Sequence, residues 1–240
     1  MVGDWQVFLQ DDGSGRTYLS WMMDAWGWTL SVAGCSWVIA VVMGALMGTL
    51  RTLPNSPWLV RLANCWVELF RNIPILVQLF LWYFVLPKIF PAMQAIPGFL
   101  LVVFGLGFFT SARIAEQVRA GVQALPKGQR YAGMAVGFTT FQTYRYVILP
   151  MAFRIILPPL TSESMNLLKN SSVAFAVSIA ELTFFFTQAA EETSRGVEIF
   201  VVVTLLYAAS AFAVNRVMAF VEKKLQIPGF IVAGGTGGGH

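Results

Sequence analysis

Three polar residues recur at helical spacing inside an apolar stretch of this chain. Glu163, Asn166 and Lys169 occupy every third position, so on a helix they spread over about 120° and can face one pocket. A carboxylate accepts hydrogen bonds from an ammonium group, whereas a lysine and an amide donate to carboxylates. The row therefore predicts a binding site for a zwitterion. The alternative is that Glu163 and Lys169 neutralise each other inside a helical bundle.

Two arginines are further candidates for contact with an anionic ligand. A ligand with two anionic groups requires cations in a low-dielectric site. Arg154 and Lys169 are the favoured pair, but their spacing places them on different faces, so the segment must change direction at Pro158-Pro159 for both to reach one ligand. Arg113 is the other candidate, although it could instead extend to lipid phosphates.

The sequence contains no motif for catalysis, for metal binding or for nucleotide binding. The only histidine is His240, at the end of the chain, and Cys35 and Cys65 both fall within apolar stretches. A phosphate-binding G-x-x-x-x-G-K-[ST] loop does not occur. The sequence predicts a chain that is not an enzyme and binds no cofactor itself, so that any energy for its work must come from another protein.

The composition indicates a membrane protein. Of the 240 residues, 57% are hydrophobic and 12% are charged, about half the charged fraction of a soluble domain. Segments near the length that crosses a bilayer cover residues 26–50, 58–86 with polar interruptions, 98–115, 150–186 and 197–221. The fourth of these is expected to be a discontinuous helix, interrupted at Pro158-Pro159 and at residues 169–172. The prediction is an all-α integral membrane protein with five transmembrane helices. Residues 1–25 precede this domain of residues 26–221, and a flexible tail covers residues 222–240.

The distribution of arginine and lysine predicts the orientation. Five crossings place the two ends on opposite sides, and basic residues are concentrated on the inner side if the N-terminus is outside. This bias accounts for the net charge of +4 without nucleic acid. In the second segment, Glu68 and Arg71 are three positions apart, so they can lie on one helical face and neutralise each other, with a role in transport as the alternative. Pro74 is expected to loosen the helix.

A charged, glycine-containing loop covers about residues 116–150. A polar helix over 116–123 should continue the third span, and Pro126 and Gly128 should break it. A short helix over 129–136, ended by Gly137, should follow. Exposed aromatic side chains beyond it favour a docking element for a cytoplasmic partner, with an amphipathic helix lying on lipid as the alternative.

The same loop carries a family resemblance. Its spacing is similar to the loop signature of ABC importer permeases, which is Glu-Ala-Ala, three residues, Gly, nine residues, Ile, any residue, Leu-Pro. Tyr131, Gly133 and Val147 depart from the signature. The corresponding ATPase-coupling residues here are Tyr131, Ala132, Gly133, Gly137, Leu149 and Pro150. Residues 68–80 and 157–182 resemble the polar amino acid branch of this family, and most closely its glutamate/aspartate importer permeases.

This resemblance implies a fold, partners and an activity. The fold would be the type I ABC importer permease architecture with a cytoplasmic coupling helix. Partners would be a second permease, homologous or identical, two cytoplasmic ATPase subunits that bind the ATP, a periplasmic amino-acid-binding protein and membrane lipid. The chain would then import glutamate or aspartate across the bacterial inner membrane by alternating access. Import of another polar amino acid such as glutamine, or passive conduction of a solute, are the alternatives.

Overall fold

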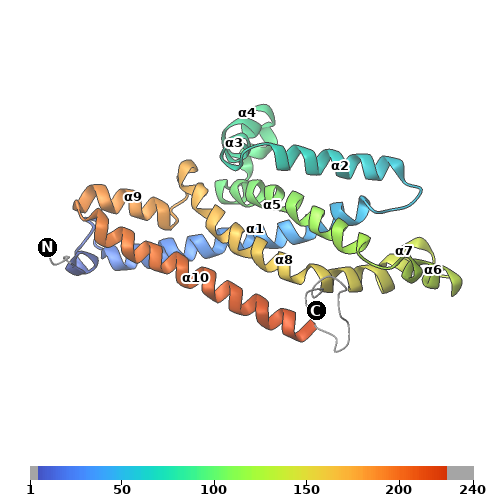
Figure 1. Cartoon of the computed structure of the whole chain (residues 1–240). Coiled ribbons are helices and arrows are strands. Elements are labelled where there is room, and N and C mark those ends of the chain that lie inside the picture. The colour runs from blue at the N-terminus through green and yellow to red at the C-terminus, as the bar shows by residue number, and fades with distance from the viewer. Residues whose placement is uncertain (1–4, 226–240) are drawn as a thin grey trace.

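Long apolar runs form the three longest helices. The computed structural model describes residues 5–225, and α1 (Tyr18–Leu50), α5 (Gly98–Gln123) and α10 (Gly196–Leu225) extend lengthwise through it (Figure 1). Each contains an 18-residue window with a mean hydropathy of at least 1.8, and each is long enough for the roughly 30 Å hydrocarbon core. The first, third and fifth predicted spans are therefore confirmed. However, α1 begins at Tyr18 rather than at residue 26. Helix α10 continues to Leu225, so the predicted tail does not begin at residue 222, and the rest of that prediction lies outside the described residues.

The second predicted span is sharply bent at Pro74. Helix α2 (Pro57–Asn72) ends there, and the following segment consists of α3 (Ile75–Phe80), a π-helical turn η2 (Leu81–Val85) and α4 (Leu86–Ile89). The two halves meet at 107°. Buried Gln78 donates hydrogen bonds to the carbonyls of Phe70 and Ile73, which the proline leaves without backbone donors. Pro74 thus ends the helix instead of only loosening it.

The sequence predicts two interruptions in the fourth span, at Pro158-Pro159 and at residues 169–172, and the structure confirms the second but not the first. Helix α8 (Leu149–Asn170) continues through Pro158-Pro159, so the expected change of direction at these prolines is wrong. Its side chains Ile156 and Leu160 pack against α5 in a shared core cluster, which holds the helix in place despite the two missing donors. The break comes later, through the 3-10 helix η5 (Ser171–Val177), and α9 (Leu182–Thr193) then continues at a 52° bend.

Glycines allow α1 and α5 to approach closely. A Cβ atom placed on Gly48 would lie 2.6 Å from Cβ of Val118 and 2.7 Å from the Ala115 carbonyl oxygen, and one on Gly44 would lie 2.6 Å from Cβ of Ile114. Small residues at such positions are typical of packed membrane helices, where close backbone contact replaces the hydrophobic effect. This interface fixes α5, which carries one of the candidate site residues.

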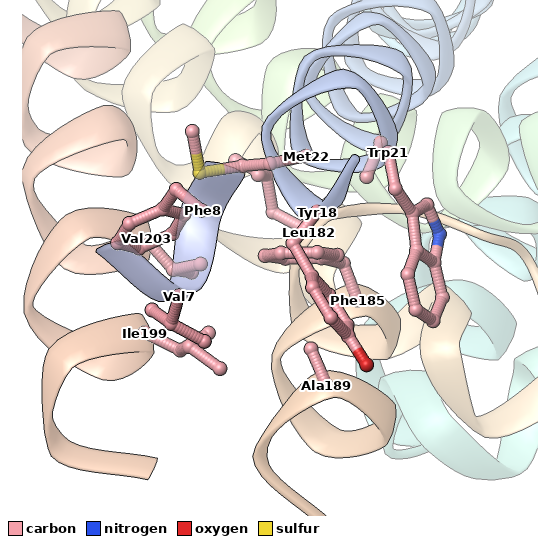
Figure 2. Packing of buried hydrophobic residues seen from close by; sticks show 11 residues of the cluster. Val7, Phe8, Tyr18, Trp21, Met22, Leu182, Phe185, Ala189, Ile199 and Val203 are labelled. Atoms are coloured by element: carbon pink, nitrogen blue, oxygen red, sulfur yellow. The ribbon is translucent and has the colours of Figure 1, made fainter. Parts of the chain in front are cut away.

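The N-terminal end of the bundle has its own apolar core. The 3-10 helix η1 (Trp5–Leu9) inserts Val7 and Phe8 among side chains of α1, α9 and α10 (Figure 2). A polar network lies nearby. Buried Glu181 caps α9 by accepting from the Phe184 backbone N–H, and the Tyr207 hydroxyl donates to it at 2.6 Å. These contacts fix α9 to α10 at the end farthest from α6 and α7 (Figure 1).

Candidate functional site

An ion pair joins the two central helices α5 and α8. The Arg113 Nε atom lies 3.1 Å from one carboxylate oxygen of Glu163 and 3.3 Å from the other. The Glu163 side chain is 9% exposed, whereas the Arg113 side chain is 45% exposed. The pair therefore fixes a buried carboxylate and leaves part of the guanidinium accessible. Arg113 contacts Glu163 rather than only extending to lipid. It is therefore Arg113, and not Lys169 as the sequence alternative had it, that pairs with Glu163.

The other two residues of the polar row lie farther along α8. Asn166 is half-buried, and Lys169 is exposed in the last turn of the helix. Glu163 and Lys169 are about 9 Å apart along the helix axis. The long, flexible lysine side chain can bring its ammonium group closer to Glu163 than that. Together the ionisable groups Arg113, Glu163 and Lys169 carry one net positive charge. This arrangement can accept one ammonium group and donate to two carboxylates.

Arg154 lies away from this group. It precedes Glu163 by nine positions and Lys169 by 15 positions, so on the unbroken helix α8 it is about 14 Å and about 22 Å away along the axis. The structure does not bring Arg154 and Lys169 together. Instead, Arg154 lines a separate cavity together with Arg145 and Leu225.

A second charge cluster joins three helices near the loop. Arg51 and Arg71 both approach the same Glu116 oxygen, at 2.9 Å and 3.2 Å, and Arg51 also donates to the Asn64 side chain at 2.7 Å. The expected pairing of Arg71 with Glu68 is therefore wrong. The sequence offered no indication of the true partner, because Glu116 is 45 positions away on α5.

The loop between α5 and α8 contains the expected short helix. Helix α6 (Lys127–Ala135) is followed by Gly137 at φ +84°, a backbone conformation that favours glycine, and by α7 (Thr140–Thr143) and a π-helical turn η4 (Tyr144–Ile148). A Cβ atom on Gly133 would lie 2.9 Å from Cγ2 of Thr143, so α6 packs tightly on α7. The predicted helix over 129–136 is confirmed, with its start moved to Lys127.

The loop exposes several large apolar side chains and is attached to the bundle by a hydrogen bond. The Tyr144 hydroxyl donates to the Thr52 carbonyl at 2.6 Å, which anchors the loop beside the end of α1. Exposed side chains in the loop include Tyr131, Met134, Val136 and Phe141, with exposed fractions between 57% and 72%. Tyr131 occupies the signature position that holds glutamate elsewhere, so this position offers a phenol instead of a charge.

The described residues offer no place for a metal. Within residues 5–225, His, Cys, Asp and Glu side chains do not gather in groups of three that could hold an ion. The α5–α8 pair itself offers charge and hydrogen-bonding groups for binding.

Comparison with known proteins finds relatives that match nearly the whole chain. The chain is 40% identical to the glutamate/aspartate import permease protein GltJ of Escherichia coli (strain K12), over 94% of this chain and 96% of GltJ. It is 35% identical to the probable amino-acid ABC transporter permease protein PatM of Vibrio harveyi, over 83% of this chain and 89% of PatM. A crystal structure of an amino acid ABC transporter has a TM-score of 0.76 at 27% identity and covers 93% of this chain and all of the matched one.

The fold recurs in a more distant transporter as well. A chain of the MetNI methionine ABC transporter has a TM-score of 0.71 at 19% identity, with 91% of this chain covered. The model of binding-protein-dependent transport system inner membrane components matches residues 40–227. Helical membrane spans, the loop between α5 and α8, and this match over most of the sequence lead to one conclusion: the chain belongs to the binding-protein-dependent transport system inner membrane component family and is an ABC importer permease, not an enzyme.

Proposed function

We propose that this permease moves glutamate or aspartate across the bacterial inner membrane, past the Arg113–Glu163 pair. The observation that supports this substrate class is the charge of the group formed by Arg113, Glu163 and Lys169. An acidic amino acid carries one ammonium group and two carboxylates. Glu163 would accept the ammonium group, Arg113 and Lys169 would each bind a carboxylate, and Asn166 would add an amide donor. The name of the relative GltJ points to the same substrates.

The loop between α5 and α8 would couple this site to ATP hydrolysis. Arg113 lies on α5 and Glu163 lies on α8, and the loop connects these two helices directly. In our proposal its exposed apolar residues dock on a cytoplasmic ATPase subunit, which binds the ATP. Movement of the docked loop would then shift α5 against α8 as rigid bodies and open the site alternately to each side.

The remaining partners follow from the same proposal. A second permease, identical or homologous, would complete the membrane pathway, two ATPase subunits would dock beneath the pair, and a periplasmic binding protein would deliver the amino acid. The N-terminus would be periplasmic and the C-terminus cytoplasmic, as the basic residues favour. Several relatives are named as glutamine permeases, such as GlnP of Escherichia coli (strain K12) at 32% identity, so glutamine is the second candidate substrate.

Substitution of Lys169 tests the substrate class. Lys169→Gln removes the cation assigned to one carboxylate, and the glutamine side chain can still offer hydrogen bonds to a neutral amide. We expect glutamate uptake to weaken by about tenfold or more, because a charged hydrogen bond contributes about 1.5–3 kcal/mol, while glutamine uptake changes little. Competition between labelled glutamate and unlabelled glutamine, measured in vesicles with ATP, reports both values. An equal loss for both amino acids would contradict the assignment of Lys169 to the second carboxylate.

Substitution of Gly137 tests the docking loop. Gly137→Trp places a large side chain at a left-handed backbone position with open space around it. We expect the turn between α6 and α7 to change and the ATPase to be lost from the purified complex. Gly13→Trp is the matched control, because Gly13 also has a positive φ (+85°) and open surroundings but lies near the start of α1. Copurification of undiminished ATPase with the Gly137 variant would count against the docking role.

A further inference from the structure

A cavity between α8 and α10 combines two arginines with an apolar wall. Its volume is about 380 Å³, and it lies at the end of the bundle that carries α6 and α7. Arg145 and Arg154 line it, and the apolar wall is formed by Leu149, Pro150, Phe153, Leu157 and Leu225. Within residues 5–225, no ion pair neutralises either guanidinium of this cavity.

The π-helical turn η4 brings the two arginines to the same cavity. They are nine positions apart, and on an uninterrupted α-helix such residues point in opposite directions, about 180° apart. The wider turn of η4 (Tyr144–Ile148) accommodates one additional residue. This shifts the register of Arg145 by about 100° relative to α8, and both side chains line one cavity. Single π turns in α-helices are frequent at functional sites.

We propose that this cavity binds an anionic phospholipid. Its phosphate would lie between Arg145 and Arg154, since two guanidinium groups offer paired donors to phosphate oxygens. The first part of an acyl chain would lie along Phe153, Leu157 and Leu225. Basic pockets between membrane helices are suited to such head groups. A free anion would gain nothing from the apolar wall and would lose hydration there, so the mixed lining favours a lipid over inorganic phosphate.

The position of the cavity fits a lipid that stabilises the coupling loop. Arg145 lies in η4, which follows α7 directly, while Leu225 is the last residue of α10. A lipid bound here would connect the loop to the end of α10, where Glu222, Lys223 and Lys224 together add one net positive charge. This role is separate from substrate binding, because Arg154 lies about 14 Å along α8 from Glu163.

Lipid binding to the purified full-length complex in detergent tests the proposal. Native mass spectrometry would follow titration with phosphatidylglycerol, with phosphatidylcholine of the same acyl chains, and with inorganic phosphate as competitor. We expect Arg145→Gln/Arg154→Gln to weaken phosphatidylglycerol binding by about a hundredfold, and Arg154→Gln alone by about tenfold. The control Arg61→Gln/Arg119→Gln removes two cations outside the cavity and outside the docking loop and should bind phosphatidylglycerol as the unmodified complex does.

Several outcomes would overturn the proposal. Undiminished phosphatidylglycerol binding by the double variant would show that the lipid binds elsewhere. Equal binding of phosphatidylcholine and phosphatidylglycerol would show that the net negative charge of the lipid does not determine binding. Displacement of the lipid by inorganic phosphate would indicate a site for free anions. Loss of the ATPase from the double variant with lipid binding intact would instead assign the arginines to a protein contact. Because none of these measurements uses uptake, they are independent of the proposed substrate.

Discussion

Replacement of Glu163 by alanine is expected to lower ATP-dependent glutamate uptake by about ten- to a hundredfold. The substitution removes the carboxylate proposed to accept the substrate ammonium group, and charged hydrogen bonds of this kind contribute about 1.5–3 kcal/mol. It also leaves the Arg113 guanidinium without its partner 3.1 Å away. Because the Arg113 side chain is 45% exposed, water reduces that second penalty, and the complex should still assemble. Uptake and copurification of the ATPase would be measured on the same preparation.

Two further variants separate binding from simple neutralisation. In Arg113→Ala/Glu163→Ala both charges are removed, so uptake should recover if the only role of Glu163 is to neutralise Arg113. We expect no recovery, because the double variant also lacks the carboxylate for the ammonium group. Glu68→Ala, which removes an exposed carboxylate on α2, serves as the control and should transport normally. Normal uptake by a well-assembled Glu163→Ala complex would rule out the proposed role of this residue.

Gly48→Val should cause the largest loss of stability among single substitutions in α1. The new Cβ atom would lie 2.6 Å from Val118 Cβ and 2.7 Å from a backbone oxygen, and the backbone cannot move aside as a flexible side chain can. Inserting atoms into a packed interface costs about 1–3 kcal/mol, and the two γ-methyl groups of valine place the effect at the upper end, about 3 kcal/mol. Thermal unfolding in detergent would detect it as a marked decrease in Tm.

The control for this prediction lies in the same helix. A Cβ atom on Gly34 would meet nothing within 4 Å, so Gly34→Val changes the same residue type without a clash. Its Tm should remain close to that of the unmodified chain. If both valine variants unfolded at the same temperature, close packing of α1 on α5 would not be the source of the stability.

The parts of the fold that depend on local sequence could be predicted. Apolar length identified α1, α5 and α10, and Pro126 with Gly137 marked the limits of the short helix in the loop. The positions of bends were harder to predict, because the effect of a proline on a helix depends on the residues packed around it. At Pro74 the helix ends and Gln78 satisfies the free carbonyls, whereas at Pro158-Pro159 packing against α5 keeps the helix continuous.

The candidate site was only partly accessible from the sequence. The row of Glu163, Asn166 and Lys169 was visible because its members share one helix. Partners on other helices were not, since pairing depends on how the helices pack: Glu163 meets Arg113, and Arg71 meets Glu116, in each case across 45 or more positions. Arg154 was favoured as a cation for the same ligand as Lys169, but both could reach that ligand only if the helix changed direction at the prolines, and it does not.

Transport of labelled glutamate into vesicles that contain this permease with its copurifying subunits tests the central claim most directly. ATP would be present or absent inside the vesicles, and unlabelled glutamine would be added as competitor. The proposed function predicts glutamate uptake that requires ATP and that excess glutamine does not inhibit. Uptake without nucleotide would contradict the importer mechanism and indicate a passive channel, while strong inhibition by glutamine would contradict the assignment of an acidic substrate.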